Sequence, residues 1–513
     1  MKRILAILLC CCLLAGCSVG SGDSYTPTGK GLTWDDGYTG PVQEATEPEV
    51  PQEITLICYP DKTMNPILST DFTNRALFSL IYQSLFVVDR DYQVEPMLCK
   101  RYTRSQDMKT YTFYIENATF SDGTRLTAQD VVATLQAAME STVYSGRFNH
   151  VSEIALSGDG GITVQLTTAY ENLPVLLDIP IIKASELESD APLGTGPYVF
   201  EKNVTGMRLR RRSNWWCSAN MSVTAPVIKV VPAESPTQIR DEFEFADLNL
   251  VCADPGSDNY ADFRCDFELW DCENGIFLYL ACNMSSEVFS NQELRAALTY
   301  AIDRDTLVEE HYRGFARSAV LPMSPQSPYY SQKLADSYSY DSLKFAQAVN
   351  AAALYQEEPL VFLVNSDDSL RLRVARDIRD MLVDCGLQVQ MRELSTNDYR
   401  YALLIRNYDI YLGQTKLSAN MDLSPFFYNA GTLSYGGISD VGTYSLCLEA
   451  LANHGNYYTL HQKIMEEGLL CPILFRSYAV YATRGLLSDL SPARDNVFYY
   501  SLGKTMDSAF TEQ

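Results

Sequence analysis

The sequence predicts an α/β fold with mixed sheets, and two observations carry this prediction. Residues 359–394 read as a strand, "PLVFLVNS", then a helix, then a second strand, "GLQVQMREL". A strand, a helix and a strand in this short order form a βαβ unit, whose two strands are parallel. The stretch "TYTFYI" alternates instead, with Tyr111, Phe113 and Ile115 on one face, as in a half-buried strand.

Capping signals place the first helix. In "SDGT", the pair Asp122-Gly123 marks a hairpin or tight turn. The helix that follows begins with Thr127 as its N-cap, and Asp130 completes a capping box. Its apolar face comprises Val131, Leu135, Ala138 and Met139.

Two further helices are predicted in the second half of the chain. In "SNQELRAALTYAIDRDTLV", Ser290 is the expected cap and Glu293 its capping-box partner. The apolar stripe of this helix comprises Leu294, Ala297, Leu298, Ala301 and Ile302. The helix of the βαβ unit turns Val374, Ile378, Met381 and Leu382 inward, and Gly386 suits its C-terminal end.

The N-terminus reads as an export signal. Lys2 and Arg3 precede eleven apolar residues, which are too few to span a bilayer. The quartet "LAGC" at 14–17 resembles the lipobox of bacterial lipoproteins, which implies cleavage after Gly16 and lipidation of Cys17. Two or more acyl chains anchor a protein stably, at about 0.8 kcal/mol per buried methylene. The alternative is an ordinary cleaved signal with an incidental cysteine.

Residues 18–52 are rich in Gly, Ser, Thr, Pro and acids, with Lys30 as their only cation. This composition predicts a disordered tether between the anchor and a folded body. No later apolar run reaches 18 residues, so no other segment is predicted to span a membrane. The remaining chain is long enough for two or three domains.

The net charge of −24 argues against nucleic acid as a partner, because nucleic-acid binding needs a basic surface. One run, "MRLRRRSNWW", is basic. It alternates like a strand, so its charges are predicted to form a solvated strand face rather than an anion site.

Ten of the 14 cysteines remain after residue 17. An even number outside the cell permits disulfides, whose pairing the sequence does not give, and buried free thiols are the alternative. There is no C-x-x-C in this part of the chain and only four histidines in all, so no metal site is predicted. No cofactor is predicted either.

Two stretches resemble catalytic or nucleotide-binding motifs, but neither has the residues or the position that the motif requires. "GCSVG" matches G-x-S-x-G but lies across the lipobox, and "GTGPY" lacks the third glycine of a dinucleotide loop. His150, His311, His454 and His461 are scattered and are interpreted as surface or core residues. We therefore predict that the protein is not an enzyme; a hydrolase with a spatially paired cysteine and histidine is the alternative.

Several stretches, taken in order, resemble one protein family. They are "TMNPILSTDFTNRALFSLIYQSLFVVDRDYQVEPMLCKRY", "FSDGTRLTAQDVVATLQ", "GTGPYVF", "NQELRAALTYAIDRDTLV", "NYDIYLG" and "CPILFRSYAVYA". Each alone is weak, but their order from about residue 53 to 481 is specific. The chain resembles the bacterial extracellular solute-binding proteins of family 5, the oligopeptide-, dipeptide- and nickel-binding lipoproteins of ABC importers.

The resemblance implies a two-lobed periplasmic-binding-protein-like fold with mixed sheets, hinge strands and an additional third domain. The first lobe would comprise residues 53–66, 193–276 and 476–513, the additional domain 67–192, and the second lobe 277–475. "GIFLYLACN" and "PILFRSYAVY" would be the two strands that cross between the lobes.

The resemblance also implies a function. A lipid-anchored, monomeric receptor on the outer face of the bacterial cytoplasmic membrane would capture a small peptide between its lobes and pass it to ABC permease and ATPase subunits. The alternatives are another small solute (a metal chelate, an opine or an oligosaccharide) or a surface sensor or adhesin on the same fold.

Site residues follow from the matched segments. Peptide-binding members carry "G-W" and then an acid that holds the peptide α-amine, whereas this chain has Gln414 and Thr415, then Ser418 or Ala419. Lys416 would favour an anionic group. The predicted ligand-binding residues are Asn65, Asp71, Tyr279, Gln414, Thr415, Lys416 and Asp422. Two have structural alternatives, since Asn65-Pro66 can shape a turn and Asp71 can cap a helix.

Overall fold

The computed structural model describes residues 54–255, 263–352, 356, 358–487 and 489–512. The predicted signal, Cys17 and the tether lie outside the described residues. Within the described residues, no helix combines the length and the apolar content that crossing a bilayer requires.

The first sheet has four strands in the order β1-β10-β9-β8. β1 and β10 are parallel, and the other pairs are antiparallel. Two short helices, α2 (Phe72–Arg75) and α3 (Phe78–Ile81), follow β1 along the chain. The strands are β1 (Ile54–Cys58), β8 (Tyr198–Asn203), β9 (Gly206–Arg211) and β10 (Val227–Pro232).

A second sheet has five strands in the order β18-β4-β5-β7-β6, with the helix α4 (Ala128–Glu140) beside it. Its C-terminal strand β18 pairs with β4, so the end of the described chain lies in this five-stranded sheet. Its strands are β4 (Cys99–Arg104), β5 (Thr110–Ile115), β6 (Val151–Leu156), β7 (Ile162–Leu166) and β18 (Phe510–Glu512). A separate hairpin joins β2 (Phe86–Val88) and β3 (Val94–Pro96).

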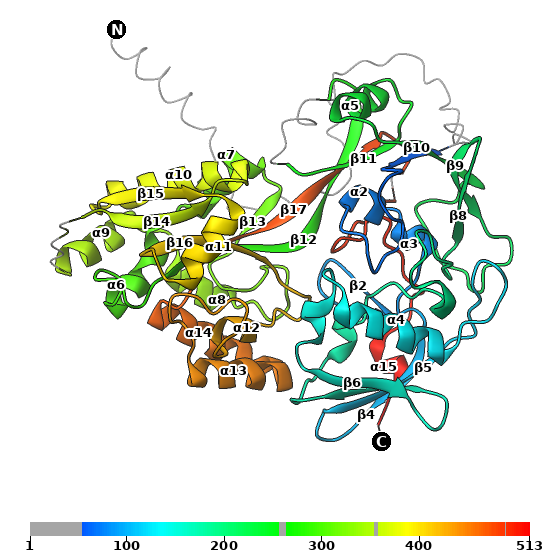
Figure 1. Ribbon diagram of the computed structural model, residues 1–513, viewed down its shortest axis with the longest axis horizontal. Helices are drawn as coiled ribbons and strands as arrows, with labels where there is room; N and C mark the ends of the chain where they lie inside the picture. Colours follow the sequence, from blue (N-terminus) through cyan, green and yellow to red (C-terminus); the bar gives the residue numbers. More distant parts are fainter. Residues whose placement is uncertain (1–53, 256–262, 353–355, 357, 488, 513) are drawn as a thin grey trace, which may run out of the picture. The chain divides into compact units, whose positions relative to one another are not determined.

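The largest sheet has the order β11-β17-β12-β16-β14-β15, and β13 also pairs with β17. Its two longest strands, β12 and β17, lie side by side and antiparallel, and both cross the predicted lobe boundary (Figure 1). The strands are β11 (Leu250–Ala253), β12 (Phe267–Cys282), β13 (Ala316–Ser318), β14 (Leu360–Asn365), β15 (Val389–Leu394), β16 (Ile410–Lys416) and β17 (Cys471–Thr483).

The remaining helices lie mostly in the second half of the chain. They are α5 (Pro236–Glu244), α6 (Gln292–Ala297), α7 (Arg304–Tyr312), α8 (Gln332–Ala335), α9 (Ser342–Ala351), α10 (Ser369–Asp384), α11 (Thr396–Leu404), α12 (Ser424–Phe427), α13 (Val441–Ala452), α14 (Tyr457–Glu467) and α15 (Met506–Ala509). Two apolar cores flank the large sheet. Leu278, Leu412 and Ile473 belong to one core, and Phe277, Tyr411 and Phe475 belong to the other.

Three predicted elements are confirmed. Helix α4 begins at Ala128 with the complete Thr127–Asp130 capping box. β5 buries Tyr111 and Phe113 on one face. β14 and β15 are parallel and are joined by α10, as the βαβ prediction requires.

The helix predicted after Ser290 is wrong in two respects. Its N-cap is Asn291, whose side chain accepts from the backbone N–H groups of Glu293 and Leu294. The α-helix also ends at Ala297, and the rest of the predicted stripe continues as a 3₁₀ turn, Leu298–Ala301. Asp303, which follows the stripe, caps a separate helix, α7, by accepting from Thr306 N–H.

Arg304, the first residue of α7, explains why this break is fixed. The side chain is 4% exposed. Its guanidinium donates to the carbonyl oxygens of Thr299, Ile302, Ala319 and Pro472 and to the Thr299 hydroxyl. One buried cation thus ties the start of α7 to the start of β17.

The "GTGPY" motif is a packing element rather than a phosphate loop. The N–H of Gly196 donates to the carbonyl oxygen of Ile81. Arg212, at the end of the basic run, donates to the carbonyl oxygens of Thr195, Gly196 and Phe120. The predicted solvated face holds for Arg208 and Arg210, which pair with Glu201, but not for the buried Arg212.

Replacing Gly196 by alanine is expected to lower the free energy of unfolding by about 2 kcal/mol, the usual cost of overpacking. A Cβ atom there would lie 2.5 Å from the Ile81 carbonyl carbon and 2.6 Å from its oxygen. Denaturant unfolding measures the change. Gly158→Ala is the matched control, because nothing lies within 4 Å of a Cβ at that position; equal effects in both variants would contradict the prediction.

All ten cysteines beyond residue 17 lie within the described residues and are free thiols. Burial raises the pKa of each one, for example the pKa of Cys58 to about 11 and that of Cys99 to about 12. A thiol needs its thiolate form to act as a nucleophile, so these values count against a cysteine hydrolase.

His461 on α14 makes the stability sensitive to acid. The ring is fully buried, and neither ring nitrogen has a hydrogen-bond partner among the described residues. Burial lowers its pKa from 6.5 to about 3. The unfolded chain therefore takes up a proton first as the pH falls, and this contribution to stability, complete above pH 6.5, is lost progressively below it.

We expect the free energy of unfolding to fall by roughly 2 kcal/mol more between pH 7 and pH 5 in the wild type than in a His461→Leu variant. Leucine keeps the apolar volume and cannot bind a proton. Denaturant unfolding at both pH values measures the difference. Parallel losses in the two proteins would show that other groups cause the acid sensitivity.

Candidate binding site

Strand β16 presents the predicted residues on two different faces. It pairs with β12 so that Gln414 lies opposite Leu278, and Gly413 lies opposite Tyr279. Because side chains alternate along a strand, Gln414 and Lys416 share one face, whereas Thr415 lies on the other. The Gln414–Lys416 face is the polar continuation of the core that contains Leu412.

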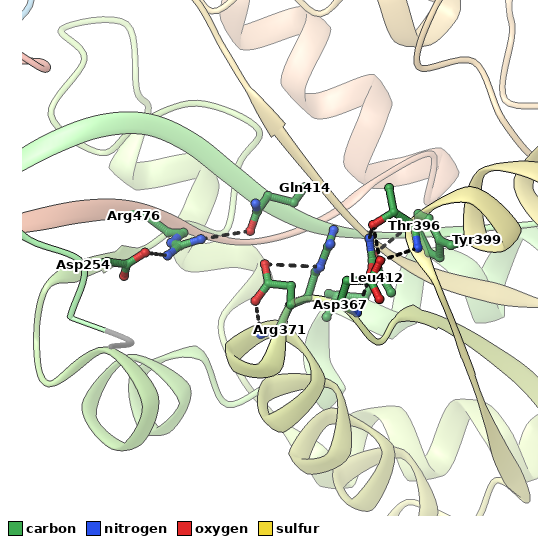
Figure 2. Close-up of polar contacts among 10 residues, drawn as sticks. Asp254, Asp367, Arg371, Thr396, Tyr399, Leu412, Gln414 and Arg476 are labelled. Carbon is green, nitrogen blue, oxygen red and sulfur yellow. Dashed lines mark hydrogen bonds and ion pairs between the residues drawn. The ribbon is translucent and has the colours of Figure 1, made fainter. Parts of the chain in front are cut away.

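Gln414 belongs to a polar group built across three strands (Figure 2). The Gln414 Oε1 atom accepts from Arg476 Nη1 at 3.2 Å, and Arg476 Nη2 pairs with Asp254 Oδ2 at 2.5 Å. Arg476 lies on β17 and is 6% exposed, and Asp254 follows β11. A buried guanidinium is therefore held between a carboxylate and an amide at the crossing strands.

Arg371 of α10 lies in the same group (Figure 2). It is 9% exposed, and its Nε atom is 3.7 Å from Asp368 Oδ2. No acceptor among the described residues lies within hydrogen-bond distance of its guanidinium, and its Nε atom is buried without a partner. Its carbon CZ lies 5.9 Å from the ring centre of Tyr399, whose hydroxyl donates to Leu412 O. This arginine is thus positioned but has unused hydrogen-bond donors.

Tyr312 lies within the electrostatic reach of both arginines. Its ring is 5.7 Å from the Arg476 guanidinium carbon. Burial raises the pKa of Tyr312 to about 12, so its hydroxyl stays protonated at neutral pH. The group as a whole offers two cations, Arg371 and Arg476, and two acids, Asp254 and Asp368. Such a set suits a ligand that carries both signs of charge.

Lys416 belongs to a second group on the same face of β16. It forms an ion pair with Asp495, which lies in the C-terminal segment. Burial alone would raise the pKa of Asp495, but the charges of Lys416 and Arg75 hold it below the usual range. Nearby, the rings of Phe72 and Tyr478 stack at 3.6 Å. The Lys416–Asp495 ion pair joins β16 to the C-terminal segment, and the Phe72–Tyr478 stack joins the segment after Asp71 to β17.

The other predicted residues occupy separate environments. Tyr279 is 2% exposed and packs in the core against Phe426. The Asn65 amide donates to the carbonyl oxygens of Leu187 and Ser189, which fixes a turn. Asp71 caps α2 by accepting from Asn74 N–H. The structure therefore gives Asn65 and Asp71 the structural contacts that were weighed as alternatives.

Asp422, which follows β16, contacts His150, which directly precedes β6. Its Oδ2 atom is 3.1 Å from His150 Nε2, and it also accepts from the Ser424 hydroxyl. Burial alone would raise the pKa of Asp422, but the hydrogen bond and charge of His150 lower it below the usual range. Among the described residues it hydrogen-bonds with His150, Asn420 and Ser424 but not with Gln414 or Lys416, so the structure does not join it to either group.

Two residues that the sequence did not single out belong to this candidate site: Arg371 and Arg476. A signal was present for Arg476, since a lone cation in the apolar strand "PILFRSYAVY" cannot be buried without partners. For Arg371 the signal was weak, because α10 carries several other arginines that lie on its outer face.

Comparisons with known proteins agree on one family. The model of the bacterial extracellular solute-binding proteins, family 5, matches residues 93–437, more than half of the chain. The glutathione-binding protein GsiB of Escherichia coli strain K12 is 24% identical over 348 residues, which cover 64% of this chain and 67% of that protein.

Solved structures show the fold. The ABC transporter substrate binding protein CtaP of Listeria monocytogenes superposes with a TM-score of 0.71 at 18% identity, covering 87% of this chain and 97% of that chain. The oligopeptide-binding protein AppA of Bacillus subtilis, in complex with a nonapeptide, gives 0.60 at 18% identity, covering 88% and 99%. The predicted fold class and the resemblance are confirmed.

Proposed function

The chain belongs to family 5 of the bacterial extracellular solute-binding proteins, the substrate-binding components of ABC importers, and we propose that its solute is a short peptide. Proteins of this kind bind a small solute and deliver it to a permease. The peptide would lie against β16, with a carboxylate on Arg371.

The proposal rests on the buried guanidinium of Arg371, whose Nε atom has no hydrogen-bond partner among the described residues. A buried guanidinium that lacks hydrogen-bond acceptors is costly, and a carboxylate can satisfy it through two parallel hydrogen bonds. Arg476 is less available to a ligand, because its guanidinium already donates to Asp254 and to Gln414. The two nearby acids, Asp254 and Asp368, would attract the positive end of the same ligand. A peptide carries both charges.

The relatives support a peptide. The Escherichia coli relative is a glutathione-binding protein, and the Bacillus subtilis structure holds a nonapeptide. The amine-holding acid expected near Ser418 is missing here. We therefore infer that the ligand's amine is bound through the acids beside the arginines instead.

The proposed location rests on the N-terminal sequence. Cleavage after Gly16 and lipidation of Cys17 would fix the chain to the outer face of the cytoplasmic membrane, with residues 18–52 as the tether. A tether keeps the receptor close to its permease and so raises the effective concentration of the receptor there. Mass spectrometry of the protein extracted from membranes would detect the diacylated Cys17.

Native mass spectrometry of the chain from Ser18 onward, purified gently from cells, tests the peptide proposal. Bound masses that fragment as peptides would support it and give the range of lengths. A discrete non-peptide mass would replace the peptide with a metal chelate, an opine or an oligosaccharide. Protein without bound mass, whose melting temperature responds to no member of a broad solute panel, would contradict the importer role in favour of a sensor or adhesin.

A further inference from the structure

A small cavity lies beside the Lys416–Asp495 pair. Its lining comes from residues 75–180 and 494–500. Its volume is about 90 Å³, enough for several water molecules or a short polar side chain. The charged residues of its lining are Arg75, Arg147, Arg494, Asp178 and Asp495, and its uncharged polar residues include Ser79, Tyr144 and Asn496. It shares no lining residue with the Arg371–Arg476 group.

The charges around this cavity do not balance. Arg147 pairs with Asp178, and Asp495 pairs with Lys416. Arg75 and Arg494 have no ion-pair partner among the described residues. Arg75 donates only to the Ser69 carbonyl oxygen and the Tyr144 hydroxyl, which are neutral. Neither guanidinium group therefore has a carboxylate of the described residues within ion-pair distance, and the Asp495 charge that acts on both is already paired with Lys416.

Among the side chains that line the cavity, Arg494 has the most buried hydrogen-bond donors without a partner. It is 8% exposed, and both its Nε and Nη1 atoms are buried without a hydrogen-bond partner. Tyr92 covers one face of its guanidinium, with 4.8 Å between the guanidinium carbon and the ring centre. The hydroxyl of Ser79 and the Oδ1 atom of Asn496 are also buried and unpartnered at this cavity. The Arg494 guanidinium and the Ser79 hydroxyl are therefore donors at the cavity that an acceptor would complete, whereas Asn496 Oδ1 is itself an acceptor.

We propose that this cavity is a carboxylate-binding subsite, which rests on the proposed function in that an acidic side chain of the bound peptide would fill it. A carboxylate has two oxygens that can each accept from a guanidinium, and its single negative charge would offset the surplus of positive charge. An amide of the same shape would leave one of its own N–H groups facing Arg494. The subsite therefore selects peptides with Glu or Asp at one position.

The test compares acid and amide peptide pairs, Ala-Glu-Ala with Ala-Gln-Ala and Ala-Asp-Ala with Ala-Asn-Ala, by isothermal titration calorimetry on the chain from Ser18 onward. We expect at least one acidic peptide to bind at least tenfold more tightly than its amide partner. In Arg494→Gln this preference should disappear while the affinity for the amide peptide changes less than threefold.

A second variant guards against loss of folding in the first. Ser79→Leu fills the cavity without changing any charge, and we expect the same loss of preference for the acid. Arg208→Gln is the matched control, since Arg208 is an exposed arginine paired with Glu201 and does not line the cavity. Circular dichroism confirms that each variant is folded.

A melting-temperature measurement with sodium formate tests the subsite without any peptide. A rise in melting temperature with formate in the wild type, absent in Arg494→Gln, would support the subsite with a free carboxylate as its source. If no peptide binds the wild type, the proposed function fails, and formate alone still decides for or against the subsite. Peptides that bind without discrimination, together with no Arg494-dependent formate effect, would overturn the subsite.

Discussion

Replacing Arg304 by methionine is expected to lower the free energy of unfolding by roughly 3–5 kcal/mol. The change removes all five hydrogen bonds that the buried guanidinium makes to Thr299, Ile302, Ala319 and Pro472. Each carbonyl oxygen left without a donor in the interior loses its share of stabilisation, and methionine has no N–H to replace it. Denaturant unfolding followed by fluorescence measures the loss.

Arg208→Met is the control for Arg304→Met. Arg208 is an arginine of the same size whose side chain is half exposed, and it pairs with Glu201 at the surface. A surface ion pair contributes about 1 kcal/mol or less, so this variant should unfold nearly as the wild type does. Comparable losses in both variants would show that burial of the Arg304 guanidinium is not what matters.

Replacing Arg371 by glutamine is expected to weaken peptide binding roughly 100-fold. Glutamine keeps the stem of the side chain but loses the charge and the paired donors that a carboxylate requires. The backbone N–H of residue 371, which donates to Asp368, is retained, so α10 should still begin where it does. Titration calorimetry with the peptide identified by native mass spectrometry measures the affinity.

Arg376→Gln on the same helix is the matched control. Arg376 is half exposed and pairs with Glu393 at 3.4 Å rather than with a residue of the Arg371–Arg476 group. Its affinity for the peptide should equal that of the wild type. An unchanged affinity in Arg371→Gln, with both variants folded, would remove Arg371 from the site.

Local signals in the sequence predicted much of the fold. The capping box at Thr127, the alternation in β5 and the βαβ unit are decided by residues close together in the chain, and all three are present. The break between α6 and α7 was missed because its cause is distant. Arg304 is held there by Ala319 and Pro472, which no pattern within one helix can show.

The candidate site was predicted only in part, for a related reason. Gln414 and Lys416 were found because they stand in a segment that matches the family. Arg371, Arg476 and Arg494 come from three remote segments, and their importance depends on which partners they lack or have in space. Asn65 and Asp71 lie in a matching segment too, yet backbone groups occupy both side chains. The Asn65 amide binds Leu187 O, Ser189 O and Ile67 N–H, and the Asp71 carboxylate accepts from Asn74 N–H.

The ten free thiols bear on how the protein matures. A chain that needs no cystine can reach its native state without an oxidase or a disulfide isomerase, at whatever redox potential surrounds it. The same protonated, mostly buried sulfurs react slowly with peroxide, since oxidation begins from an accessible thiolate. Reductants should therefore leave the melting temperature unchanged, which makes this receptor equally suited to anoxic and to aerated habitats.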